Sequence, residues 1–355
     1  MTPSPSAAER PFLVRLLHGV WIALRQAWNS DFQPPGYELP KDATFDLRRT
    51  APYIVVHLGC IGLLWVGWSW FAVGAAVFLY LLRMFAITAF YHRYFSHRAY
   101  KTSRFMQWVF AVWGNLAMQR GALWWAATHR HHHQHSDEED DKHSVRQQGF
   151  LWAHIGWLTA SANFPTDYKR IPDLAKYPEL VWLNQHDFVI PVLYGAVLWF
   201  IGGMLETYAP GLGTNGAQLF IWGFFVSTVF LMHGTLFINS LAHVWGRRRF
   251  NTTDDSKNSL VLSLITLGEG WHNNHHRYAH SARQGFFWWE IDVSYYLLKM
   301  FSWIGLVKDL RPVPAQVYAE VKAASSTPSI MESLRGTEEH LVIPQDKEST
   351  NRTIR

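Results

Sequence analysis

The alternation of apolar and polar stretches predicts four membrane-spanning helices. An apolar run of about 20 residues is long enough to cross the hydrocarbon layer of a bilayer as a helix. Little more than Ser69 separates the first two such runs, and a polar, glycine-rich stretch separates the last two. The four runs are residues 53–70, 72–91, 188–205 and 217–241. We therefore predict an all-α integral membrane protein built from two helical hairpins.

The remaining segments predict helices that do not cross the membrane. Residues 11–28 place apolar and basic residues at helical spacing, which fits a helix lying on a membrane surface and equally a helix docked on the rest of the protein. Residues 105–125 and 285–307 are rich in Trp but carry polar and charged residues, so we expect interfacial or cap helices. A short helix is expected near 315–325, before a mobile tail. The domains we predict are 1–50, 51–311 and 312–355.

The distribution of basic residues predicts the orientation in the membrane. Lys and Arg occur before the first run, between the second and third, and after the fourth at Arg247–Arg249. The two opposite connections, at Ser69 and at 206–216, contain neither. Because cytoplasmic loops carry the excess of basic residues, both termini should be cytoplasmic. The run at Arg247–Arg249 follows a span and is no sign of nucleic-acid binding. Arg83 interrupts the second run, so its side chain must reach the interface or face the protein interior.

Three histidine clusters lie at the cytoplasmic boundary of these runs: His92-Arg-Tyr-Phe-Ser-His97, His129-Arg-His-His132-His133 and His272-Asn-Asn-His275-His276. In the second and third clusters the spacing i, i+3, i+4 places three imidazoles on one face of a helix turn. His92 and His97 are five residues apart, about 140° around an ideal helix, so they should not share a face. We expect the chain to turn after His92.

Together these clusters predict a site for two metal ions beside the membrane. Asn239-Ser-Leu-Ala-His243 closes the fourth run, with Asn239 and His243 one turn apart. Imidazole nitrogen suits transition metals, and nine imidazoles are too many for one ion of ordinary coordination number. The candidate ligands are His92, His97, His129, His132, His133, Asn239, His243, His272, His275 and His276.

Other histidines and the nearby acidic run are expected to play lesser roles. His131 is offset by about 200° from His129 and should point away from the metals. His135 and His143 lie close to the second cluster, and His233 lies within the fourth run, where it either supports a ligand or is satisfied by a neighbour. The isolated histidines are expected to be hydrogen-bonded or solvated: His18, His57, His154, His186, His280 and His340. Most of 137–141 should be a solvated loop, with Asp137 as a candidate partner for a ligand histidine.

At these residues the chain resembles the membrane fatty acid desaturases, and more closely their acyl-CoA Δ9 (stearoyl-CoA type) group. The resemblance runs from about residue 50 to 311. Besides the histidine clusters it includes Gly268-Glu-Gly270 and Trp289-Glu-Ile-Asp292. It implies a four-span fold with a cytoplasmic helical cap that carries a histidine-ligated di-iron centre. The implied reaction inserts a cis double bond, at Δ9, into a saturated acyl chain, using O2 and two electrons.

The resemblance also implies partners. The substrate is a fatty acyl chain with acyl-CoA favoured, although eukaryotic members carry Arg-Asp where this chain has Ala127-Thr128, so their headgroup contacts do not transfer. No cytochrome-b5-like domain is evident, so electrons should come from a separate ferredoxin, rubredoxin or cytochrome b5 with its reductase. The shorter, bacterial-type members suggest a bacterial inner membrane. Residues around Ala76–Tyr80 are candidates to close the acyl tunnel.

Two other functions fit parts of the pattern. A membrane di-iron lipid hydroxylase would use a similar histidine scaffold, and it differs only in the steps after the first hydrogen abstraction. A metal-binding transporter would normally place ionisable ligands at mid-membrane along a path, whereas here they gather at one boundary. An acyl-lipid desaturase remains an alternative to the acyl-CoA enzyme. Zinc does not fit oxidation chemistry because it has no redox states.

Overall fold

The computed structural model describes residues 11–34, 36 and 44–326, and within these ranges every regular element is a helix. Four helical segments are long and apolar enough to cross a membrane: Arg49–Val66, Trp70–Ser96, Val189–Tyr208 and Gly216–Val244. All four predicted spans are therefore confirmed, with ends shifted by a few residues. His340 and most of the predicted tail lie outside the described residues.

Each hairpin turns where the sequence supplies turn and capping residues. The first span comprises α2 (Leu47–Gly59), η2 (Cys60–Gly62) and α3 (Leu63–Val66), and it ends at Gly67, whose φ is +61°. Ser69 then caps α4 (Trp70–Phe85) by accepting a hydrogen bond from the amide of Ala72. The Ser69 hydroxyl also donates to Gln218 at 2.7 Å, so the first turn is tied to the second hairpin.

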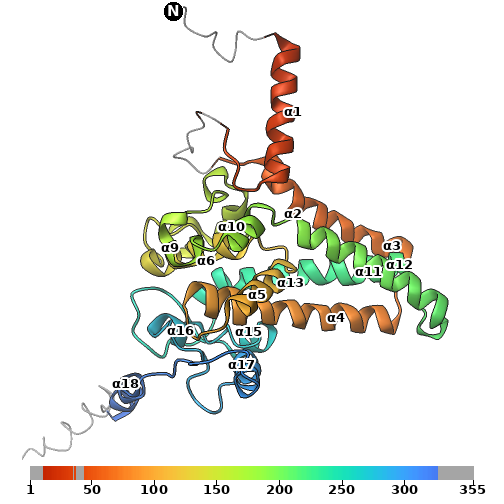
Figure 1. The fold of residues 1–355 in the computed structure, drawn as a ribbon. Coiled ribbons are helices and arrows are strands. Elements are labelled where there is room, and N and C mark those ends of the chain that lie inside the picture. The colour runs from red at the N-terminus through yellow and green to blue at the C-terminus, as the bar shows by residue number, and fades with distance from the viewer. Residues whose placement is uncertain (1–10, 35, 37–43, 327–355) are drawn as a thin grey trace, which may run out of the picture. The chain divides into compact units, whose positions relative to one another are not determined.

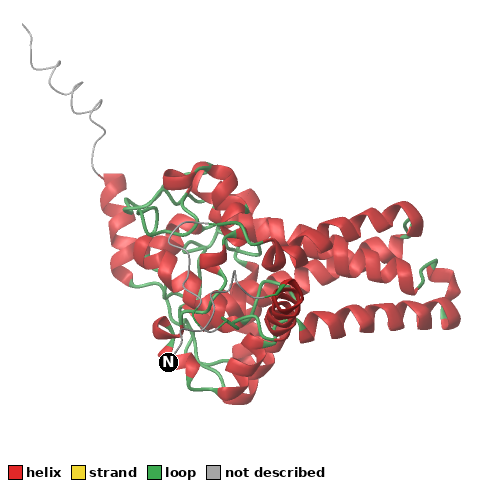
Figure 2. Cartoon of the chain, turned by 90° about the horizontal axis from the view of Figure 1, so that it is seen from above, coloured by secondary structure: helices red, strands yellow, loops and turns green. Residues whose placement is uncertain are grey.

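The second hairpin joins α11 (Val189–Tyr208) through η7 (Pro210–Leu212) to a span of four consecutive segments. These segments are α12 (Gly216–Phe220), η8 (Ile221–Val226), α13 (Ser227–Asn239) and α14 (Leu241–Val244). In Figure 1 the spans run together to one side of the cap, and Figure 2 shows the same arrangement from above. The first and third spans both pack against η8.

The second span ends in a π-helix, η3 (Ala86–Ser96), and this corrects one expectation. An α-helical geometry put His92 and His97 on different faces. In η3 the hydrogen bonds run from i to i+5, and the amide of His97 donates to the carbonyl of His92 at 3.2 Å. Residues five apart therefore follow one another on about the same side, and both histidines can face the same point.

Arg83 faces the protein interior, which is one of the two predicted outcomes. Its side chain is fully buried. The guanidinium donates to the hydroxyls of Ser227 and Thr228, each at 2.7 Å, and to the carbonyl of Leu116 at 3.2 Å. These bonds join the second and fourth spans, and they replace the water that a buried cation would otherwise need.

The cap is made of short helices packed over the ends of the spans. Its core lies where η3 meets α5 (Arg104–Asn115) and α6 (Ala122–His135), and the rings of Phe90 and Phe110 stack there with centroids 3.9 Å apart. The other cap helices are α7 (Val145–Gln148), α8 (Phe150–His154), η4 (Gly156–Thr159), η5 (Ser161–Asn163), η6 (Tyr168–Arg170), α9 (Pro172–Ala175), α10 (Pro178–Gln185), α15 (Leu260–Ile265), α16 (His272–Arg277) and α17 (Val293–Trp303).

The helices predicted outside the spans are confirmed. Residues 11–28 form α1 (Phe12–Trp28), which runs across the direction of the spans in Figure 1 and leaves large apolar side chains such as Leu17 and Trp21 exposed. The stretches 105–125 and 285–307 supply cap helices. Residues 315–325 form most of α18 (Ala315–Ser326), which belongs to a unit separate from the rest of the fold.

Candidate metal centre

Two groups of histidines come together beside the ends of the second and fourth spans. Within each group, one nitrogen from every imidazole lies within 4.8 Å of the others. The first histidine group is His92, His97, His129, His133 and His275. The second histidine group is His132, His243, His272 and His276. The structure thus brings together all nine imidazoles that the sequence named, and it divides them into two sets.

α6 and α16 each contribute to both groups, which corrects the expectation of one shared face. On α6, His129 and His133 belong to the first group and His132 to the second. On α16, His275 belongs to the first group while its neighbour His276 belongs to the second. The reason is geometric: adjacent helical residues point about 100° apart, so the i+3 and i+4 positions face different points. Each helix therefore spans both groups and holds them side by side.

The distances between nitrogens fit ligands of a common ion. Nε2 of His97 lies 2.8 Å from Nε2 of His129, and Nε2 of His243 lies 3.1 Å from Nε2 of His272. Two further pairs in the first group are 2.8 and 3.0 Å apart. Imidazole nitrogens about 2.1 Å from one metal ion, at right angles to each other, would be about 3.0 Å apart. The donor set therefore fits two adjacent metal ions.

A buried nitrogen without a partner supports the same interpretation. Nδ1 of His276 lies 2.8 Å from a carboxylate oxygen of Asp254. Nε2 of His276 is buried and has no hydrogen-bond partner among the described residues. Leaving a buried polar atom unsatisfied costs about 1–3 kcal/mol. A metal ion bound at this nitrogen would remove that cost.

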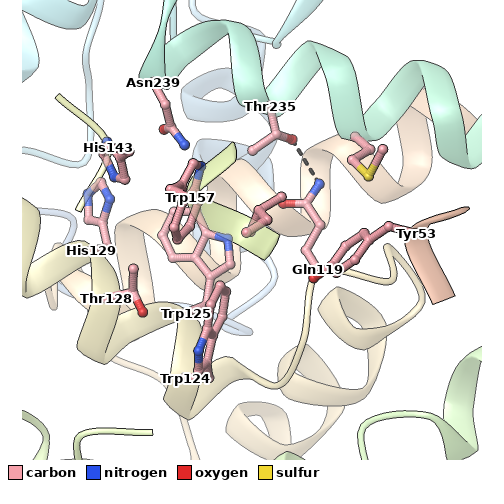
Figure 3. A pocket seen from close by; sticks show the side chains of 12 residues that line it. Tyr53, Gln119, Trp124, Trp125, Thr128, His129, His143, Trp157, Thr235 and Asn239 are labelled. Atoms are coloured by element: carbon pink, nitrogen blue, oxygen red, sulfur yellow. Dashed lines mark hydrogen bonds between the residues drawn. The ribbon is translucent and has the colours of Figure 1, made fainter. Parts of the chain in front are cut away.

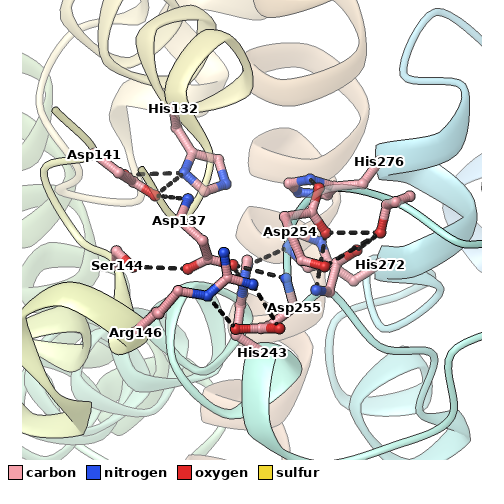
Figure 4. Close-up of polar contacts among 12 residues, drawn as sticks. His132, Asp137, Asp141, Ser144, Arg146, His243, Asp254, Asp255, His272 and His276 are labelled. Atoms are coloured by element: carbon pink, nitrogen blue, oxygen red, sulfur yellow. Dashed lines mark hydrogen bonds and ion pairs between the residues drawn. The ribbon is translucent and has the colours of Figure 1, made fainter. Parts of the chain in front are cut away.

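Carboxylates outside the two groups orient the imidazoles (Figure 4). Nδ1 of His132 lies 3.0 Å from Asp141, and Nδ1 of His243 lies 2.9 Å from Asp137. Glu269 pairs in the same way with Nδ1 of His92. A carboxylate that accepts from Nδ1–H leaves the lone pair on Nε2, the atom that faces its group.

The acidic run 137–141 was predicted correctly only in part. Asp137 is the partner of a candidate ligand, as proposed. Asp141 is also fully buried and bound to His132, so the solvated-loop interpretation was wrong for it. The residues between them are exposed, as expected for a loop. Asp254 and Glu269 were not predicted, because only the folded chain brings them to His276 and His92.

Burial and mutual repulsion keep most of these imidazoles neutral. Seven histidines of the two groups lie outside the spans. Both effects lower the pKa of six of them: His97, His129, His133, His272, His275 and His276. Burial acts in the same direction on His132, but the charge and hydrogen bond of Asp141, together with the charges of Asp137 and Asp254, outweigh it and raise the pKa. Neutral imidazole is the form that binds metal ions, so these histidines are already in the protonation state that metal binding needs.

The remaining described histidines have other partners. His131 points away from both groups, and its Nε2 lies 2.9 Å from the carbonyl of Asp140. His233 is satisfied by its neighbours His57 and His154, at 3.1 and 2.9 Å. Near the second group, burial lowers the pKa of His143 to about 3, and the ring lies beside Trp157.

Two small apolar cavities border the histidine groups. The first, about 50 Å³, is lined by tryptophans including Trp125 and reaches His129 and Asn239 (Figure 3). Across it the side-chain amide of Gln119 donates to Thr235 at 2.9 Å. The second, about 40 Å³, shares four of these residues and extends along the second span to Met84. The shared residues place the two cavities next to each other beside the histidines, and we call the two cavities together the apolar passage.

Comparison with known proteins agrees with this site. Residues 68–304 match the family model for fatty acid desaturases. The chain is 37% identical over 256 residues to a sn-1 stearoyl-lipid 9-desaturase of Synechocystis, which covers 71% of this chain and 75% of the relative. It is 35% identical over 253 residues to a sn-2 palmitoyl-lipid 9-desaturase of Nostoc, and this match covers 70% of this chain and 84% of the relative. An acyl-CoA 5-desaturase of Anemone leveillei is 34% identical over 255 residues, covering 70% and 74%.

The family match includes the second, third and fourth spans and every residue of the two histidine groups. With the all-helical fold and the histidine groups at the span ends, it shows that the chain belongs to the fatty acid desaturase family of membrane oxidoreductases.

Proposed function

We propose that this protein is an O2-dependent desaturase that inserts a cis double bond, at Δ9, into a saturated fatty acyl chain at a di-iron centre. The first and second histidine groups would each hold one iron ion, with Asn239 as a weaker neutral ligand of the second. The observation that carries the proposal is the pair of histidine groups bordered by apolar cavities. The name of the family and those of its relatives support the reaction.

Iron fits the reaction because it has redox states. Removing hydrogen from an unactivated methylene needs a strong oxidant, which a pair of irons can supply from O2, whereas zinc has no redox chemistry. Overall, the acyl chain loses two hydrogens, two electrons and two protons are taken up, and O2 leaves as two waters. The chain's own residues hold the imidazoles neutral, orient them through carboxylates, and exclude water with Trp125 and its neighbours.

The apolar passage would position the substrate. A mid-chain methylene would lie in the cavity lined by Trp125, His129 and Asn239, and the rest of the chain would extend toward Met84. Gln119 and Thr235, which are hydrogen-bonded to each other, line the first cavity, and a chain that bends around them would give a cis product. A lipid hydroxylase would share this geometry, so product analysis has to distinguish the two.

For the carrier of the acyl chain we propose a membrane lipid rather than the CoA thioester that the resemblance favoured. Two relatives, at 37% and 35% identity, are named lipid 9-desaturases, while two at 34% are named acyl-CoA desaturases that act at position 5. Ala127-Thr128 also departs from the Arg-Asp pair of the eukaryotic acyl-CoA enzymes.

We further propose that the metal centre and both termini lie on the cytoplasmic side of a bacterial inner membrane. The basic residues at the cap ends of the spans support this orientation. The exposed apolar side chains of α1 would rest in the interface beside them. Electrons would come from a separate carrier such as a ferredoxin, a rubredoxin or cytochrome b5 with its reductase.

The test is expression in a desaturase-deficient host, followed by mass spectrometry of derivatised fatty acid methyl esters. We expect a new cis Δ9 monoene with the wild type and none with His132→Ala. A hydroxylated chain would favour the hydroxylase instead. Unchanged saturated chains, with iron-loaded protein and each class of electron donor supplied, would contradict the proposal.

A further inference from the structure

An apolar groove separates the first and third spans at their cap ends. Its volume is about 520 Å³. Its floor is formed by the fourth span at Phe224, Phe225 and Met232, and its sides include Val55 of α2 and Val192 of α11. Val55 is 56% exposed and Val192 62% exposed, and both lie on spans. The groove therefore opens sideways, toward the lipid around the protein.

The groove shares two lining residues with the cavity beside the histidines. Tyr53 and Met232 line both. From these two residues the smaller cavity leads past Trp125 to His129 and Asn239. These shared residues place the groove next to the cavity beside the histidines, whereas Met84 lines only the second cavity.

Polar groups gather at the end of the groove that faces the cap. Arg49, Arg120 and Asp187 line it there together with the last turns of α1. The Arg120 side chain is only 9% exposed, and it is anchored through Nε to Asp187 at 2.7 Å and through Nη1 to the carbonyl of Phe164 at 3.2 Å.

The second terminal nitrogen of Arg120 has no hydrogen-bond partner among the described residues, only a longer ion-pair contact. Nη2 is buried, makes no hydrogen bond to any of them, and lies 3.6 Å from Asp31. The backbone of Arg120 also has φ +64°, an uncommon conformation for a side chain of this size. A guanidinium nitrogen held beside an apolar groove, with a donor to spare but with Asp187 and Asp31 already balancing its charge, suits a neutral ester carbonyl oxygen.

We propose that this groove is the lateral opening through which a membrane glycerolipid presents its acyl chain to the metal centre. The ester region of the lipid would bind at Arg120, one acyl chain would pass Tyr53 and Met232 to the histidines, and the headgroup would remain beside α1. This inference rests on the proposed desaturase function and names how its substrate is recognised.

The charges favour a lipid over an acyl-CoA at this opening. CoA carries several phosphate charges that must remain in water or meet a cluster of cations. Here the charge of Arg120 is balanced by Asp187 and Asp31, which leaves one hydrogen-bond donor but no free cation. Arg49 donates to neighbouring carbonyls, and the sides of the groove are lipid-facing valines. A glycerolipid needs only one or two polar contacts at the interface and an apolar path for its chain.

The test uses the full-length protein in nanodiscs that contain a diacyl phosphatidylglycerol with a photoactivatable diazirine in the middle of one acyl chain. Cross-links are mapped by mass spectrometry. Val192→Trp fills the groove, and Val197→Trp is the matched control, because Val197 is equally lipid-facing on α11 but does not line the groove. This readout needs neither iron nor an electron donor.

We expect the wild type and Val197→Trp to be labelled at Tyr53, Met232 or Trp125. Val192→Trp should lower that labelling about tenfold. Arg120→Lys, which keeps a positive charge beside Asp187 but lacks the second nitrogen, should lower it about threefold. Equal labelling in Val192→Trp and Val197→Trp, or labelling only of lipid-facing positions, would overturn the lateral opening. The lateral opening would also be overturned if soluble stearoyl-CoA abolished the labelling while Val192→Trp left it unchanged.

The same variants in the desaturase-deficient host separate this inference from the proposed function. Monoene formation by the wild type and undiminished formation by Val192→Trp would overturn the lateral opening alone. An absence of monoene from iron-loaded wild type supplied with each class of electron donor, with phospholipid labelling at Tyr53 intact, would overturn the desaturase function and support the lipid site.

Discussion

Nδ1 of His243 lies 2.9 Å from a carboxylate oxygen of Asp137, 106 residues away along the chain. Asp137 also accepts from the hydroxyl of Ser144 and from the amide of Asp255, both at 2.8 Å. Burial opposes its charge, but the hydrogen bond from His243 lowers its pKa, so the carboxylate stays ionised. One residue of the cap thus holds a candidate ligand at the end of the fourth span.

Removing the charge of Asp137 should weaken the binding of one metal ion more than that of the other. Asp137→Asn keeps the shape of the side chain but no longer holds Nδ1 of His243 protonated and oriented. We expect affinity for one iron to fall about 10–100-fold. Iron content after dialysis measures this effect. Glu139→Gln, a change of exposed charge in the same run, is the control, and equal iron loss in both variants would contradict the assigned role.

The neutral histidines predict instability in acid for the metal-free protein. Where folding lowers the pKa of a histidine, the unfolded chain binds more protons than the folded chain at pH values below 6.5, the ordinary histidine pKa. The free energy of unfolding therefore falls as the pH drops through 6.5. Within the two histidine groups, six histidines act in this direction and His132 acts in the opposite one. The Tm of chelator-treated protein in detergent should fall between about pH 7.5 and 5.5. A Tm that rises over this interval would be inconsistent with neutral, buried imidazoles.

Tyr80 is the predicted end of the acyl passage. It lies one helical turn before Met84, which lines the cavity beside the histidines, and its hydroxyl donates to the carbonyl of Ile265 at 2.7 Å. Tyr80→Ala should open space beyond Met84 and shift the products toward longer chains. The chain-length profile of the methyl esters measures the shift, with lipid-facing Leu81→Ala as control. An unchanged profile would remove Tyr80 from this role.

Gly270 allows the third histidine cluster to approach the rest of the cap. A Cβ at this position would lie 2.1 Å from the amide nitrogen of Ser263 and 2.5 Å from the carbonyl of Ser259. Gly270→Ala should therefore displace α16, destabilise the fold by about 1–3 kcal/mol and reduce iron binding in both groups. Thermal unfolding and iron content test this. Gly74→Ala, where a Cβ meets nothing within 4 Å, should have neither effect.

The parts that could be predicted from the sequence are those determined by local pattern. Apolar length alone indicated the four spans, and histidine spacing indicated which imidazoles gather. The π-helical turn that aligns His92 with His97 was not predictable, because a π-helix has no comparable spacing signal. The roles of Asp141, Asp254 and Glu269 as histidine partners were not predictable for another reason: only the folded chain places their carboxylates at imidazole nitrogens.

The most direct test of the central claim is the metal content of the purified protein, measured by mass spectrometry together with Mössbauer spectroscopy. We predict two irons per chain for the wild type. His97→Ala should selectively weaken the first histidine group and His272→Ala the second, so each should retain close to one iron. Zinc in place of iron, a single iron in the wild type, or loss of the same ion in both variants would contradict a di-iron centre divided between the two groups.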